Sequence, residues 1–316
     1  MSSFLPSIPF SDDLGRGEST RGIHRLMAVL YELRYKLRYV DNLTLKVDKD
    51  YRMHGTLLHL VLADYYARKM EQNGLPPPPW LHALNPATGR EWSLDERLMT
   101  VGVGFTEEIR ATREFHNYYL HVARDEDWQP IAVERELLLA LIDFPEIREE
   151  AIAEGLGDEQ VTCRGDLTVV RNGGLWAVDY KSMNYAKKDT LPPWREGPEH
   201  TMSLQMLFQL RALRAAYGAE RVKGVIIMRL KRNAPYHYDR HPIVFDELLY
   251  RRSAFTILGR VRQEREIRAR VAAGKPIVPC LGECRGNYTC DYINLCQASA
   301  AVMPLVLKAD FTKRTP

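Results

Sequence analysis

The chain has 316 residues, of which 45% are hydrophobic and 27% are charged, and its 44 Lys and Arg against 41 Asp and Glu give a formal net charge of +3. This composition is typical of a soluble globular protein and excludes a disordered, collagen-like or fibrous chain. No apolar run approaches the roughly 18 residues that a membrane span needs, and the first residues lack the regions of a signal peptide. We therefore expect a cytoplasmic protein, and the small net charge leaves the kind of partner open.

The first part of the chain is predicted to be mainly helical. Residues 1–20 are rich in Ser, Pro and Gly and are expected to form a flexible N-terminus. Apolar residues then recur at helical spacing within 21–40, from about 55, and from about 107 to 123. The second of these helices should stop before the prolines at 76–79. Residues 21–125 are thus expected to form a helical portion.

From residue 126 the pattern becomes that of a mixed α/β domain. Strands are predicted in 131–139, 161–170 and 175–182, and the Asn-Gly-Gly sequence at 172–174 predicts a hairpin between the last two. A helix ending at Gly218, a strand in 221–232 and a long charged helix from about 245 to 273 are predicted to follow. The fold class is therefore α/β, with a central mixed sheet flanked by helices in 126–275 and a cysteine-rich segment and tail in 276–316.

The predicted hairpin carries a group of charged residues at one end. Asp179 and Lys181 are two residues apart on one strand, so their side chains share a face about 6.5 Å apart, and the hairpin folds Asp166 back toward them. The run Leu175–Val178 before Asp179 is continuously apolar, which indicates a buried strand and not a solvated hairpin end. Such carboxylates suit Mg²⁺ or Mn²⁺, and a nearby lysine suits hydrolysis of a phosphodiester.

In this order of motifs the chain resembles the PD-(D/E)XK nuclease superfamily and, within it, the RecB-type exonuclease branch. The core pattern of that branch is matched by Asp166, Asp179 and Lys181, followed by Gln205 on the next helix. An upstream Gly-x-x-x-His helix is matched by Gly55 and His59. The resemblance implies a restriction-endonuclease-like core and extends over roughly Met53 to Cys296.

The resemblance also implies roles for these residues. His59, Asp166, Asp179 and the backbone carbonyl of Tyr180 would hold Mg²⁺ or Mn²⁺. Lys181 would assist the attacking water, and Gln205 would orient the lysine or the substrate. Glu134 and Glu136 resemble an acidic position of some family members, and a role in the site or as ordinary strand charges remains open for both. One departure is that the family often has Tyr four residues after the glutamine, where this chain has Gln209.

Four cysteines near the C-terminus form a second candidate metal site. They have the spacing C-x3-C-x5-C-x5-C and are Cys280, Cys284, Cys290 and Cys296. Four thiolates can hold a structural zinc or an iron-sulfur cluster, and the spacing resembles the segment that binds a four-iron, four-sulfur cluster in iron-sulfur RecB-type nucleases, including CRISPR-associated exonucleases. Those relatives usually take one cysteine from far upstream, so either Cys280 or Cys163 could be the fourth ligand here.

These features together predict a metal-dependent DNA exonuclease that acts in repair, recombination, or phage or CRISPR DNA processing. Its expected partners are DNA, single-stranded or with a free end, and a helicase or recombination protein, since the chain has no P-loop of its own. Basic residues expected to line the path of the DNA are Lys187, Lys188, Arg195, Arg229, Lys231 and Arg232. A non-catalytic DNA-binding or assembly subunit and a site-specific endonuclease on the same fold remain as alternatives.

Overall fold

The structure is a computed structural model that describes residues 22–29, 32–45, 50–123, 127–183, 203–231, 234–277, 292–299 and 301–313. The chain divides into two compact units. The described residues of the first unit lie within Lys49–Leu139 and Thr162–Tyr250, and those of the second lie within Glu18–Asp48, Ala140–Val161 and Arg251–Pro316.

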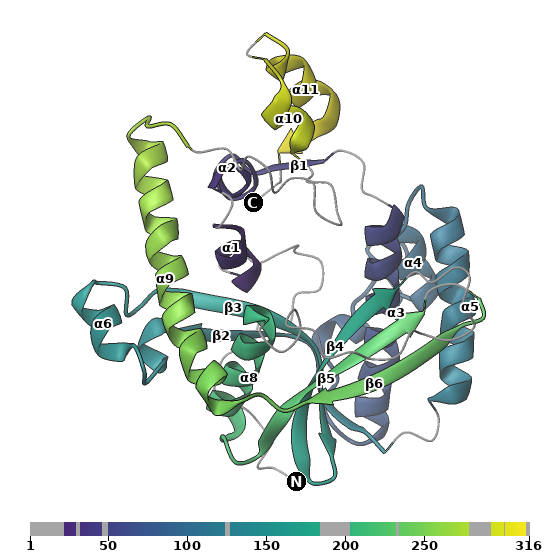
Figure 1. Ribbon diagram of the computed structural model, residues 1–316. Helices are drawn as coiled ribbons and strands as arrows, with labels where there is room; N and C mark the ends of the chain where they lie inside the picture. Colours follow the sequence, from purple (N-terminus) through teal and green to yellow (C-terminus); the bar gives the residue numbers. More distant parts are fainter. Residues whose placement is uncertain are drawn as a thin grey trace. The chain divides into compact units, whose positions relative to one another are not determined.

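A five-stranded mixed sheet forms the centre of the first unit (Figure 1). Its strands are β2 (Gln129–Ala140), β3 (Gln160–Arg171), β4 (Gly174–Met183), β5 (Val222–Lys231) and β6 (His237–Ile243), and they lie in this order across the sheet. The pairs β3/β4 and β5/β6 are antiparallel, whereas β4 and β5 are parallel. The predicted fold class, an α/β domain with a central mixed sheet, is confirmed.

The hairpin between β3 and β4 turns at the predicted Asn-Gly pair. Asn172 and Gly173 have φ of 49° and 72°, which is the left-handed backbone that a two-residue hairpin of the favoured twist requires. Asn and Gly are the residues that adopt this conformation at the lowest cost. The turn fixes the register Leu167↔Val178, and so sets the position of Asp166 relative to Asp179.

Helices cover both faces of this sheet. Helices α3 (Asp50–Gln72) and α5 (Thr106–Val122) lie side by side and share an apolar core with Ile226, Met228 and Leu230 of β5. The alternate β5 residues, among them Val225 and Ile227, are also buried, and they face the opposite side, where α8 (Leu204–Tyr217) contacts β5 and β4. The 3₁₀-helix η3 (Pro79–His82) and α4 (Leu94–Val101) also belong to the described part of the first unit. The predicted helices near 55, 107–123 and 203–218 are thus confirmed.

The second unit is mainly helical. Its described helices are α1 (Ile23–Ala28), α2 (Glu32–Tyr35), the π-helix η2 (Lys36–Val40), the 3₁₀-helix η4 (Leu141–Asp143), α6 (Arg148–Ala153), α9 (Glu247–Ala272), α10 (Ile293–Gln297) and α11 (Met303–Asp310), and its described strands are β1 (Leu43–Leu45) and β7 (Phe311–Lys313). The first turn of α9 belongs to the first unit. Strands β1 and β7 pair in antiparallel fashion and bring residues 43–45 beside 311–313. The helix predicted in 21–40 is present as separate short pieces. No helix among the described residues is long and apolar enough to cross a membrane.

Candidate metal centre

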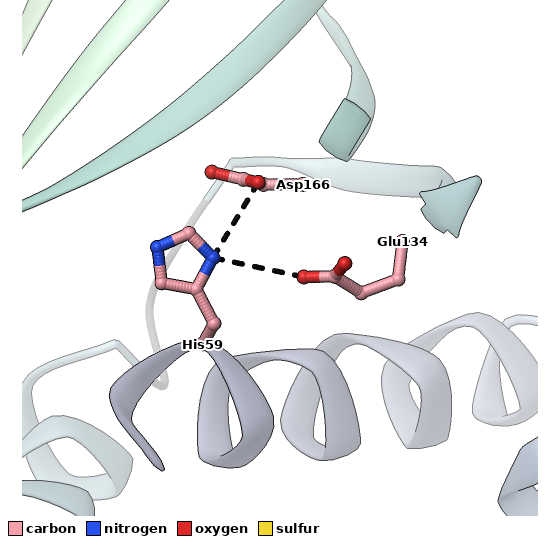
Figure 2. A group of neighbouring side chains, drawn as sticks. All are labelled: His59, Glu134 and Asp166. Carbon is pink, nitrogen blue, oxygen red and sulfur yellow. Dashed lines mark ion pairs between the residues drawn. The ribbon is translucent and has the colours of Figure 1, made fainter. Parts of the chain in front are cut away.

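Three elements of the first unit bring an imidazole and two carboxylates together (Figure 2). His59 comes from α3, Glu134 from β2 and Asp166 from β3. The Nδ1 atom of His59 lies 3.5 Å from Oδ1 of Asp166 and 3.8 Å from Oε1 of Glu134. One potential ligand atom from each residue lies within 4.8 Å of the others. Residues separated by more than 100 positions in the chain therefore form one compact group.

The hairpin partner fixes the orientation of the Asp166 carboxylate. Its Oδ2 atom accepts a 2.7 Å hydrogen bond from the backbone N–H of Tyr180 on β4. The aromatic ring of Tyr180 meets the imidazole of His59 edge to face, with the ring centroids 5.4 Å apart. Oδ1 is thereby left directed at His59. Tyr180 thus joins the strand of Asp179 to the group built on β2 and β3.

The same strand β4 provides the charged pair of Asp179 and Lys181. Oδ2 of Asp179 lies 2.7 Å from Nζ of Lys181, as expected for side chains two residues apart on one face. Asp179 is only 1% exposed, whereas 35% of the Lys181 side chain and 34% of the His59 side chain are exposed. Asp166 and Asp179 are therefore buried and the Glu134 side chain is 10% exposed, whereas the lysine and the histidine form the solvent-facing side of the group.

Glu134 occupies an unusual backbone conformation within β2. Its φ is +48°, in the left-handed region that residues other than glycine rarely adopt. The alternation of buried residues along β2 changes phase here, since Ala132 and Val133 are buried in succession. Such a conformation costs about 1–3 kcal/mol and persists only where the surrounding structure holds it. Glu136 lies two residues later on β2, on the face that a regular strand would share with Glu134, but it is not part of the group.

Burial and mutual charge shift the pKa values of the group. Burial lowers the pKa of His59, but Asp166 and Glu134 outweigh it and leave that pKa well above its usual value. Burial raises the pKa of Glu134, and it raises the pKa of Asp179 to about 6 in spite of Lys181. Burial raises the pKa of Asp166, but His59 and the hydrogen bond from the Tyr180 N–H outweigh burial and leave this pKa below its usual value. Asp179 likewise overcomes the effect of burial on Lys181, so the pKa of the ammonium is raised.

The donor set fits a hard divalent cation. Carboxylate oxygens with one imidazole nitrogen are suited to Mg²⁺ or Mn²⁺. The buried Oε1 atom of Glu134 makes no hydrogen bond within the described part of the chain, and Nδ1 of His59 lies 3.8 Å from it. A buried acceptor without a donor costs free energy, and a cation beside it removes that cost. His59, Glu134 and Asp166 could therefore hold a metal ion, with Asp179 as an electrostatic neighbour of Asp166.

The structure places the other predicted site residues as follows. Gln205 is half-buried on α8, whereas Gln209, one turn later, is fully buried. Arg229 is 4% exposed and forms a two-point ion pair with Asp239 on β6, and Lys231 is completely buried and donates a hydrogen bond to the carbonyl of Pro235. These positions differ from the expected DNA path, because neither cation is presented to a phosphate at the surface. Lys187, Lys188, Arg195 and Arg232 lie outside the described residues.

Most of the predicted cysteine cluster also lies outside the described residues, namely Cys280, Cys284 and Cys290. Cys296 is exposed on α10 in the second unit. Cys163 is buried in β3, where burial raises the pKa of its thiol, so it is a protonated core residue.

The chain belongs to the PD-(D/E)XK nuclease superfamily, whose family model matches residues 32–297. Membership implies a metal-dependent nuclease that uses Mg²⁺ or Mn²⁺ and acts on DNA, and the mixed sheet with its flanking helices agrees with the fold of that superfamily. No curated protein matches the chain.

Proposed function

We propose that the protein is a Mg²⁺- or Mn²⁺-dependent deoxyribonuclease of the RecB type that degrades DNA from a free end in the cytoplasm, in repair, recombination, or phage or CRISPR DNA processing. The observation that carries the proposal is the grouping of His59, Glu134 and Asp166 beside the Asp179–Lys181 pair. Buried carboxylates with a partly exposed lysine at their solvent side are the arrangement that metal-assisted phosphodiester hydrolysis needs.

Each residue of the group has a definite task in this proposal. His59, Glu134, Asp166 and Asp179, with the backbone carbonyl of Tyr180, would hold the ion. A bound divalent cation supplies a water of lowered pKa and stabilises the charge that develops on the phosphate. The 2.7 Å contact with Asp179 holds Lys181 in position. From this position Lys181 would orient the attacking water and neutralise the charge of the transition state. Gln205 is proposed to orient Lys181 or the DNA.

The basic residues beyond β4 are proposed to contact the DNA backbone. Lys187, Lys188 and Arg195 lie in the segment of the chain between the end of β4 at Met183 and the start of α8 at Leu204, and Arg232 directly follows β5. Phosphate contacts of this kind position a strand without reading its sequence, which suits an exonuclease. A helicase or recombination protein is the proposed protein partner.

Cys280, Cys284, Cys290 and Cys296 are proposed to hold a four-iron, four-sulfur cluster, with zinc as the alternative. The support is their spacing and the absence of other cysteines except Cys163. Anaerobic purification followed by an absorbance spectrum tests this. A brown protein with broad visible absorbance would support the cluster, and a colourless protein containing zinc would establish the alternative.

The nuclease proposal is tested with end-labelled linear DNA and closed circular DNA, single- and double-stranded, under Mg²⁺ or Mn²⁺. We expect degradation of linear DNA and sparing of circles. Asp179→Ala and Lys181→Ala should reduce cleavage by at least about 10²-fold, and the exposed lysine Lys223 on β5 provides the matched control Lys223→Ala. Cutting at fixed sites in circles would favour the site-specific endonuclease. DNA binding without cleavage under either metal would favour the non-catalytic subunit.

A further inference from the structure

Gln209 on α8 is a buried polar side chain that the proposed reaction does not use. It is only 1% exposed, and both its amide oxygen and its amide nitrogen are buried without a hydrogen bond in the described part of the chain. Almost all buried amide groups in folded proteins have a hydrogen-bonding partner. A leucine or methionine would fill the same space without the penalty of burying two polar atoms. The amide at this position therefore requires an explanation beyond packing.

The amide of Gln209 contacts the strand that carries Asp166. A Cβ atom added to Gly165 would lie 3.2 Å from Nε2 of Gln209 and 3.9 Å from the carbonyl oxygen of Arg135. The φ of Gly165 is not in the left-handed region, so the backbone itself does not require glycine there. The missing side chain instead leaves the space in which the amide sits.

The chain neighbours of these two positions are metal-binding carboxylates. Gly165 directly precedes Asp166, and Arg135 directly follows Glu134. The Gln209 amide therefore lies against Gly165 of β3, in the same space that the carbonyl of Arg135 on β2 borders, and these two backbone positions are each next in the chain to a carboxylate of the group in Figure 2. A shift of either backbone segment would change the separation of Oδ1 of Asp166 and Oε1 of Glu134.

We propose that Gln209 is a positioning residue whose buried amide, seated against Gly165, holds the β2 and β3 segments that carry Glu134 and Asp166 at the spacing a divalent cation needs. This inference rests on the proposed metal-dependent function and deepens it. Residues that do not touch the metal but orient its ligands typically contribute to binding, and their removal lowers the metal affinity about 10- to 100-fold. Gln209 would reach the metal only through the two strands, and its removal should change affinity more than it changes stability.

The first test measures Mn²⁺ binding without DNA, by electron paramagnetic resonance of the free ion, together with thermal unfolding of the metal-free protein. Gln209→Met keeps the shape of the side chain and removes its polar atoms. We expect unfolding at the same or a higher temperature and Mn²⁺ affinity at least about tenfold lower. Leu213→Met, at a buried position one turn later on α8, is the matched control and should leave the affinity unchanged. A Gln209→Met affinity within twofold of wild type overturns the inference.

The second test uses the contact itself. Gly165→Ala should lower Mn²⁺ affinity, because its Cβ displaces the amide at 3.2 Å. In a Gln209→Ala background the same change should add little, because the space is then free. Equal losses in both backgrounds would overturn the contact as the origin of the effect.

The two proposals can fail separately. A wild-type protein that binds Mn²⁺ but cleaves no DNA overturns the proposed function alone, and the affinities of the variants still decide on Gln209. A wild-type protein that binds no Mn²⁺ overturns both.

Discussion

The two units of the molecule each bury carboxylates, but they balance the charge in different ways. In the second unit Glu264 is 6% exposed and receives a 2.6 Å hydrogen bond from the hydroxyl of Tyr35. Its two oxygens also meet Arg25 and Arg268, each at 2.9 Å. Every acceptor of this carboxylate has a donor, so the network needs nothing further. Its function is to hold α1, α2 and α9 together.

The group in the first unit is not balanced in this way. Within the described part of the chain its three carboxylates, Glu134, Asp166 and Asp179, contact two cationic side chains, His59 and Lys181, and Asp166 also accepts the N–H of Tyr180. Burial raises the pKa of Glu134 and Asp179, which means that the folded protein disfavours their charged forms. A matched buried network stabilises a fold, whereas an excess of buried negative charge indicates a site that a cation completes.

The largest expected effect is on the balanced network. Glu264→Ala should cost about 3–5 kcal/mol of unfolding free energy, because the buried Arg25 and the hydroxyl of Tyr35 then lose the carboxylate that they contact. Urea unfolding measures the loss. The control is Glu266→Ala on the same helix α9, since Glu266 is 72% exposed and only 4.0 Å from Arg270; it should cost less than about 1 kcal/mol. Equal losses in the two variants would show that Glu264 is no more important than a surface residue.

The opposite behaviour is expected at the unbalanced group. Glu134→Gln should leave the metal-free protein as stable as wild type or up to about 1 kcal/mol more stable, because a raised pKa means that the buried carboxylate costs free energy at neutral pH. The same change should weaken Mn²⁺ binding at least about tenfold. Thermal unfolding and isothermal titration measure the two quantities. Glu136→Gln on the same strand is the control, and a loss of Mn²⁺ affinity there equal to that of Glu134→Gln would contradict the assignment.

The contrast between Glu134 and Glu136 also shows what the sequence could not reveal. Two residues that are two positions apart on a strand lie on the same face, so the alternating pattern does not distinguish them and leaves both as candidates. The positive φ at Glu134 interrupts the alternation, and it depends on how β2 packs. The sequence did predict the grouping of His59 with Asp166, because the helix, the hairpin and their order all agreed with one family.

The sheet was predictable where its strands are apolar and not where they are polar. Strands β4 and β5 contain continuous apolar runs, β2 and β3 are rich in apolar residues, and all four were predicted. Strand β6, with the sequence HYDRHPI, lies at the sheet edge and was missed, because its charged residues and proline resemble a loop. Its Asp239 pairs with Arg229, a contact that exists only after β5 and β6 meet. The same contact helps to hold Arg229, which was expected to line the path of the DNA, in a buried position.

The affinity of the group for Mn²⁺ should depend on pH. Asp179, with its pKa of about 6, takes up a proton below that pH, and the raised pKa of His59 keeps the imidazole protonated at neutral pH. Binding must release these protons, so affinity should fall as the pH falls, by up to about tenfold per pH unit for each proton that is released. Without metal, the Asp179 contribution to stability is present below its ordinary pKa of 3.8 and is lost as the pH rises through about 6.

The predicted direction of the pH dependence of Mn²⁺ binding can be measured by thermal unfolding. Excess Mn²⁺ should raise the unfolding temperature more at pH 7.5 than at pH 5.5, since the metal is strongly bound only at the higher pH. Glu264 is not part of the metal group, so Glu264→Ala should keep the same difference between the two pH values as wild type. A Mn²⁺-induced rise that is the same at both pH values would contradict proton-coupled binding at this group.

The smallest expected effect concerns how α3 brings His59 to the group. Gly55 lies one turn before His59, and a Cβ atom there would be 3.5 Å from Oγ of Ser182 on β4, an ordinary contact distance. Gly55→Ala should therefore stabilise α3 by about 0.5–1 kcal/mol, the usual preference for alanine inside a helix, with less than a twofold change in Mn²⁺ affinity. Gly259→Ala on α9, where nothing lies within 4 Å, is the matched control and should give the same gain. If Gly55→Ala gave no gain and weakened Mn²⁺ binding, close approach of α3 to β4 would have to be counted with the carboxylates as a determinant of the site.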